Sequence, residues 1–148
     1  MSRQQAIDHV AAHALARRTA ARQTIEQICR MSDVAFAVID ELIRQLQSEA
    51  CVALHFHPDR IAGDGRTVAE ALRDDGVYKT QFETGLSNGM LSPERGGPRD
   101  QWENELFGDA YLAPDLPLSL RPRYGALALM AHADGPSPRF GSSYFVLN

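Results

Sequence analysis

The feature that most constrains the fold is a short apolar run that ends in a cluster of polar residues at a proline. Residues 50–54 (Ala-Cys-Val-Ala-Leu) lead into His55-Phe56-His57-Pro58-Asp59-Arg60. Pro58 cannot continue a β-ladder or the interior of a helix, so an extended segment has to stop there. The sequence therefore predicts a strand over residues 51–56 that delivers two histidines, an acid and an arginine to a turn, and functional sites are often built in this way.

Two helices are predicted before this strand. Residues 2–30 contain no glycine or proline and carry an apolar stripe at helical spacing, with a break expected at Thr19. Ser32 is a suitable N-cap for a second helix over residues 33–48, which has a broad apolar face. We expect the two to form a helical hairpin, residues 1–49, that packs on a larger domain formed by residues 50–148.

Short elements are predicted after the central strand. Thr67 and Glu70 fit a capping box at the start of a helix that ends at Gly76. The alternation of residues 77–83 favours a strand, and residues 84–89 then form a loop rich in glycine and small polar side chains. The fold class expected from these elements is α+β, with a mixed sheet.

The C-terminal half is predicted to hold one more helix and two more strands. A helix over residues 100–106 would turn Trp102 and Leu106 inward and leave Glu103 as a surface charge. The strands are expected at residues 124–130 and 141–147. The last strand is strongly apolar and is followed by no turn or tail, which favours a central position in the sheet. We therefore expect the chain to be the front part of a longer domain.

Composition excludes several classes of partner. The chain has 148 residues and a net charge of −4, and its basic tracts are no longer than two residues, which argues against nucleic acid. No apolar run approaches the roughly 20 residues of a membrane span, and the N-terminus leads into no signal-peptide core. Cys29 and Cys51 are expected to be reduced thiols in a protein that is cytoplasmic in the producing cell.

Two chemistries can be derived from the central motif by itself. His55 and His57 lie two residues apart, so on a strand both imidazoles would share one face, as in some metal-dependent hydrolases. Such a site needs further ligands, and downstream only His132 remains. Alternatively, His57-Pro58-Asp59 matches the tripeptide of J-domain co-chaperones, with residues 40–53 and 67–74 as the flanking helices. Binding to an Hsp70-type partner would require a basic segment before the tripeptide, and the segment in this chain is not basic.

Five longer blocks favour a third interpretation. They occur in one order along the chain and are residues 54–60, residues 81–89, Trp102-Glu103 with Leu106-Phe107-Gly108, residues 121–127, and residues 138–142. Together they resemble a bacterial family catalogued as a domain of unknown function. That family in turn resembles mono-ADP-ribosyltransferase effectors of the CteC type, which modify a threonine of ubiquitin.

The resemblance implies an ADP-ribosyltransferase-like sheet and NAD as a substrate. Arg60 would pair with phosphate, His57 would hydrogen-bond a ribose, Tyr124 would form a wall for the nicotinamide, and Ser142 would add a polar contact. Glu83 is the internal carboxylate to test as the catalytic residue. The protein substrate would be ubiquitin or another protein in a host or target cell into which the effector is delivered.

One departure from the family keeps an alternative open. The segment that carries the family's catalytic glutamate is expected beyond the last block, after the end of this chain. Glu103 and Glu105 copy its spacing, but they lie in a predicted helix ahead of the strands they should follow. The alternative is therefore a fragment that binds NAD without turnover, or a silent relative that binds a protein partner.

Overall fold

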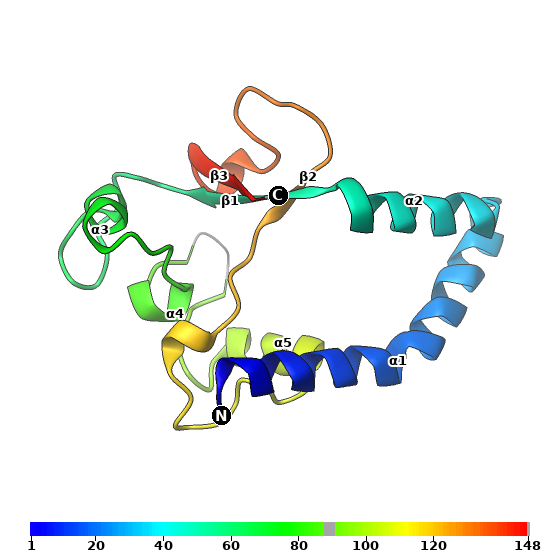
Figure 1. Ribbon diagram of the computed structural model, residues 1–148, viewed down its shortest axis with the longest axis horizontal. Helices are drawn as coiled ribbons and strands as arrows, with labels where there is room; N and C mark the ends of the chain where they lie inside the picture. The colour runs from blue at the N-terminus through cyan, green and yellow to red at the C-terminus, as the bar shows by residue number, and fades with distance from the viewer. Residues whose placement is uncertain (88–90, 148) are drawn as a thin grey trace.

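The computed structural model describes residues 1–87 and 91–147, and its class is α+β, as predicted (Figure 1). The elements in chain order, with η for 3-10 helices, are α1 (Arg3–Met31), α2 (Phe36–Glu49), β1 (Cys51–Phe56), α3 (Val68–Asp75), α4 (Gln81–Thr84), α5 (Pro98–Phe107), η1 (Leu118–Leu120), β2 (Ala126–Ala128), η2 (Pro138–Phe140) and β3 (Ser143–Leu147). The division at residue 50 into a hairpin and a larger domain stays a prediction.

Helix α1 starts at a capping box. The Ser2 hydroxyl accepts a hydrogen bond from the Gln5 backbone N–H (3.2 Å), and the Gln5 side chain accepts one from the Ser2 N–H (2.7 Å). These two bonds satisfy backbone donors that a helix start leaves unpaired. The predicted break at Thr19 is wrong, because α1 continues through it to Met31.

The start predicted for the second helix is also wrong. Ser32 belongs to the end of α1, where its backbone N–H donates to the carbonyls of Ile28 and Cys29. Asp33 then takes a left-handed φ of 53°, and α2 begins only at Phe36. The left-handed residue reverses the chain direction, which delays the second helix by three residues.

Helices α1 and α2 diverge from their junction, and the N-terminal part of α1 lies beside α5 (Figure 1). Near the junction, Arg22 forms an ion pair with Asp40 (3.3 Å) and lies over the ring of Phe36. Farther along α1, Arg17 donates to the carbonyl of Glu105 in α5 (2.9 Å). The contacts join α1 to α2 at one end and to α5 at the other.

The sheet has the strand order β2-β1-β3, and both pairings are antiparallel. The predicted strand over residues 51–56 is confirmed as the central strand β1, in which Ala53, Leu54 and His55 are buried. The expectation of a mixed sheet is not met by the three described strands. The last strand, expected to be central, is an edge strand of this sheet, with Phe145 and the two residues after it about half exposed.

The strand predicted over residues 77–83 is wrong. Thr80 is instead the N-cap of the short helix α4, and it forms a capping box with Glu83. Gly85 ends the helix with a left-handed φ of 68°. The alternating pattern was outweighed by two local backbone interactions, which together favour one helical turn. Asn88 and Gly89, at the end of the predicted loop, lie outside the described residues.

Candidate functional site

A cavity of about 710 Å³ lies between the end of β1, helices α3 and α4, the first half of α5 and the segment before β2. Its volume falls in the range of sites for small molecules and cofactors, roughly 300–1,000 Å³. Four of the five residues predicted to form the site line it, namely His57, Arg60, Glu83 and Tyr124. The fifth, Ser142, is exposed and is not part of this lining.

His55 is a structural histidine in the lining of this cavity. It is buried, its Nδ1 lies 2.9 Å from the Gly141 carbonyl oxygen, and its Nε2 accepts a hydrogen bond from the Ser137 backbone N–H (3.1 Å). This arrangement requires the proton on Nδ1, which donates to Gly141. Its ring also stacks on Tyr144. Both ring nitrogens therefore hold the segment before β3 against β1.

The polar turn after β1 is fixed to the start of α3. The carbonyl of Pro58 accepts from the Ala69 N–H (3.0 Å), and that of Arg60 accepts from the Val68 N–H (2.9 Å). The Arg60 guanidinium donates to the Ser87 carbonyl (3.2 Å). These bonds anchor the turn at both ends, so that its cationic side chain is positioned at the cavity.

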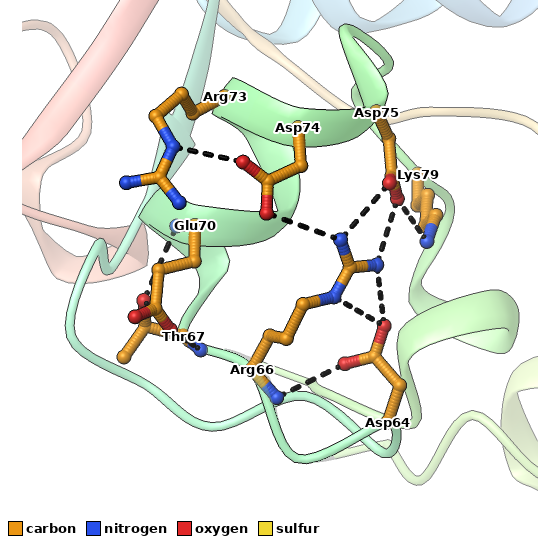
Figure 2. Close-up of polar contacts among 8 residues, drawn as sticks. All are labelled: Asp64, Arg66, Thr67, Glu70, Arg73, Asp74, Asp75 and Lys79. Carbon is orange, nitrogen blue, oxygen red and sulfur yellow. Dashed lines mark hydrogen bonds and ion pairs between the residues drawn. The ribbon is translucent and has the colours of Figure 1, made fainter.

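An ion-pair network fixes the next turn to the far end of α3 (Figure 2). Arg66 donates to both carboxylate oxygens of Asp75 (3.0 Å each) and forms a 2.7 Å ion pair with Asp64. Lys79 lies 2.6 Å from Asp75. The hydrogen bonds from Arg66, followed by that from Lys79, hold the pKa of Asp75 well below its usual value. Because Asp64 and Lys79 both line the cavity, the network fixes part of its wall.

The Thr67–Glu70 capping box predicted for α3 is confirmed, as is the left-handed Gly76 at its end. Figure 2 also shows this pair, with the Glu70 carboxylate returning to the Thr67 backbone N–H at 2.8 Å. The position of Arg66 next to the cap places its guanidinium beside the C-terminal end of the helix. The capping box and the ion-pair network therefore lie in one short stretch of the chain, residues 64–79.

Glu83 lies in the cavity wall and is half-buried. One of its carboxylate oxygens, Oε2, accepts from the Thr80 backbone N–H at 2.8 Å. Thr80 is itself buried and donates its hydroxyl to the Leu118 carbonyl (3.0 Å). The position of the carboxylate is thus fixed by a helix cap.

The expected orientation of α5 is wrong. Trp102 and Leu106 are 39% and 44% exposed, whereas Glu103, predicted to be a surface charge, is fully buried. The reason is Arg121, which is itself buried and reaches both Asp100 (2.6 Å) and Glu103 (2.9 Å). A buried cation requires carboxylate partners, so α5 turns its acidic face inward.

Tyr124 is attached to this buried cluster. Its hydroxyl donates to Glu103 Oε1 (2.7 Å), and its ring lies 5.4 Å from that of Trp102. Burial, and secondarily the hydrogen bond to Glu103, raises the pKa of Tyr124 far above its ordinary value, so the hydroxyl stays protonated at neutral pH. The Tyr124 ring lines the cavity, and the hydrogen bond from its own neutral hydroxyl to Glu103 holds it in place.

The charge of the cavity wall is predominantly positive. Five cationic side chains line it, against the two carboxylates of Asp64 and Glu83, and the five are Arg60, Lys79, Arg99, Arg123 and Arg139. Four of these cations were missed from the sequence. Arg139 lies in one of the blocks that carry the resemblance, and the three-residue spacing of Arg99 and Trp102 is a signal for a helix-face pair. The lining suits an anionic ligand.

The two chemistries derived from the central motif alone fit this geometry poorly. His55 uses both ring nitrogens for backbone hydrogen bonds, and within residues 1–87 and 91–147 no three His, Cys, Asp or Glu side chains gather as metal ligands would. His57-Pro58-Asp59 follows the strand β1, whereas the J-domain arrangement requires a helix at that point.

The comparisons with known proteins give one family. Residues 51–148, about two thirds of the chain, match the family described as Protein of unknown function (DUF3626). No curated protein and no solved structure matches the chain. In the part of the chain that the structure describes, none of the helices has both the length and the apolar composition needed to span a bilayer.

Proposed function

This chain belongs to the DUF3626 family of proteins of unknown function, and we propose that its cavity binds NAD and supports transfer of ADP-ribose to a protein. The observation that carries the proposal is that His57, Arg60, Glu83 and Tyr124 line one cavity. The mainly cationic wall suits the diphosphate of NAD. The resemblance to CteC-type effectors makes ubiquitin the first protein substrate to test.

The proposed reaction breaks the bond between the nicotinamide nitrogen and C1 of the adjoining ribose. Nicotinamide leaves with the bonding electron pair, a hydroxyl oxygen of the protein substrate bonds to C1, and the hydroxyl proton passes to a base. Positive charge develops on the ribose, and the Glu83 carboxylate is positioned to stabilise it. Arg60 pairs with the diphosphate, His57 hydrogen-bonds a ribose hydroxyl, and the ring of Tyr124 borders the nicotinamide.

One observation favours a second candidate, an NAD-binding protein without turnover. Glu83 Oε2 is already bound to the Thr80 backbone N–H, so a catalytic role would rest on its other oxygen. A carboxylate that is held by a hydrogen bond in a helix cap is less free to move toward the positive charge that develops on the ribose than a carboxylate without such a bond. In this candidate the cavity binds NAD and the chain acts by holding a protein partner.

Calorimetric titration of NAD into the chain tests the binding step. We expect saturable binding that is weakened about tenfold or more in Arg60→Ala, because one charge-assisted contact is lost. Arg73→Ala is the matched control, since Arg73 is an exposed arginine that is not part of the cavity lining. Absence of NAD binding by the folded chain would overturn both candidates.

Release of nicotinamide in the presence of ubiquitin tests turnover. Glu83→Gln is a suitable variant, because glutamine at this position of a capping box can also accept from the backbone and α4 is preserved. We expect it to bind NAD and to release no nicotinamide. NAD binding without release by the unmodified chain would establish the second candidate, and release by Glu83→Gln would remove Glu83 from the mechanism.

A further inference from the structure

Arg99 is a buried cation in the cavity wall and is not among the site residues predicted from the sequence. Its side chain is in the first turn of α5, it is only 7% exposed, and it lines the cavity. Among the described residues its guanidinium makes cation–π contacts but no hydrogen bond or ion pair, and its Nε is a buried donor without an acceptor. Buried polar groups are nearly always hydrogen-bonded, so this donor requires an explanation.

The neighbouring buried arginine, Arg121, has the carboxylate partners that Arg99 lacks, although among the described residues its Nε is likewise a buried donor without an acceptor. Arg121 contacts the carboxylates of Asp100 (2.6 Å) and Glu103 (2.9 Å). Both acids are therefore committed to Arg121, and Asp100 also accepts from the Gly96 backbone N–H. Arg99 lies beside this cluster without joining it, so its donors are left for a group in the cavity.

Two aromatic rings hold the Arg99 guanidinium in place. Its central carbon lies 5.5 Å from the centre of the Tyr124 ring and 6.0 Å from that of Trp102. The Tyr124 ring is in turn fixed by the hydrogen bond to Glu103. A planar guanidinium held on aromatic faces keeps its N–H edge in a defined direction, which is the geometry that binds phosphate oxygens in pairs.

We infer that Arg99, held on Tyr124 and Trp102, forms an anion-binding subsite of the cavity that takes a phosphate group of the ligand. The inference rests on and deepens the proposed function, because NAD carries a diphosphate. It is tested with inorganic pyrophosphate, so the subsite can be supported or rejected independently of NAD binding. The helix dipole of α5 adds to the attraction, since Arg99 lies in its first turn and no side chain caps that end.

Trp102 provides the readout, because it is the only tryptophan in the chain. Pyrophosphate is titrated into the chain at constant ionic strength while tryptophan fluorescence is recorded. We expect a saturable change in the unmodified chain and binding about ten- to a hundredfold weaker in Arg99→Gln, the loss that follows from removing charge-assisted hydrogen bonds. Arg73→Gln, the exposed control, should bind as the unmodified chain does.

A second measurement protects the test if Arg99→Gln fails to fold. In the unmodified chain, the Nε–H resonance of Arg99, assigned by its absence in Arg99→Lys, should shift on addition of pyrophosphate. An unchanged resonance at saturating pyrophosphate, or equal pyrophosphate affinity in folded Arg99→Gln, would overturn the subsite. NAD binding that is unaffected by Arg99→Gln would overturn the subsite and leave the proposed function standing. Pyrophosphate binding that depends on Arg99, without NAD binding, would support the subsite and reject NAD.

Discussion

Removal of the Glu103 carboxylate should destabilise the chain strongly. Glu103 is fully buried and accepts from both Arg121 (2.9 Å) and Tyr124 (2.7 Å). In Glu103→Ala the hydroxyl of Tyr124 loses its acceptor, and Arg121 keeps one of its two described carboxylate partners, Asp100. Breaking a buried ion pair by removing one member costs about 3–5 kcal/mol, because the remaining charge stays buried.

Urea and thermal unfolding followed by circular dichroism measure this loss. For a chain of this size, about 3–5 kcal/mol corresponds to a fall in Tm of roughly 6–20 °C and, at an m-value near 2 kcal/mol per M, to a fall in urea midpoint of roughly 1.5–2.5 M. Glu105→Ala is the matched control on the same helix, because Glu105 is exposed. We expect that variant to stay within about 0.5 kcal/mol of the unmodified chain.

The partner variant separates the ion pair from simple loss of packing. Arg121→Met alone leaves Asp100 and Glu103 as two buried acids without the cation that they share, so it should also be strongly destabilised. The double variant Glu103→Ala with Arg121→Met should lose clearly less than the sum of the two single losses. A loss below about 1 kcal/mol in Glu103→Ala, or strict additivity, would refute the buried cluster.

Three further predictions follow from single contacts. Hydrogen bonds from Arg66 lower the pKa of Asp75. The stabilisation from this ion pair should therefore be complete above about pH 4 and should be lost as the pH falls through the pKa of Asp75 in the folded chain. A carboxyl titration by NMR that gives Asp75 an ordinary or raised pKa would contradict this. Gly141→Ala should be far more destabilising in urea unfolding than Gly76→Ala. The carbon added at Gly141 would lie 2.1 Å from the Phe56 backbone, whereas the carbon added at Gly76 meets no atom within 4 Å. Equal losses of stability in the two variants would exclude the close approach at Gly141. Nitrogen NMR should show neutral His55 protonated on Nδ1, and the Nε2–H tautomer would contradict the two hydrogen bonds of its ring.

The candidate site was predictable in part. The strand β1, the turn after it and the positions of His57 and Arg60 followed from an apolar run that stops at Pro58. The resemblance added Tyr124 and Glu83, and the cavity joins all four. Ser142 was selected in the same way but is exposed, while its near neighbour Arg139 lines the cavity. The segment before β3 contributes Arg139 to the cavity lining, and it is held by hydrogen bonds with His55, which is distant in the sequence.

The sequence by itself determined features that rest on neighbouring residues. The capping box of Thr67 and Glu70, the left-handed Gly76 and the strand over residues 51–56 all depend on groups within a few residues of one another. The same local rules explain an error, since Thr80 and Glu83 form a second capping box where alternation suggested a strand. Local hydrogen bonds were therefore more reliable than a short hydrophobic pattern.

Only the tertiary structure decided which charges are buried. A glutamate and an arginine in a short polar helix are normally exposed, and the three-residue spacing of Arg99 and Trp102 indicates a shared helix face but not its burial. Their burial depends on Arg121, which approaches α5 from a later segment of the chain and draws two carboxylates inward. Turning that face inward also brings Arg99 to the cavity, where Tyr124 and Trp102 hold it. Burial is set by packing between segments distant in sequence, and this is why a local pattern could not predict the cationic wall of the site.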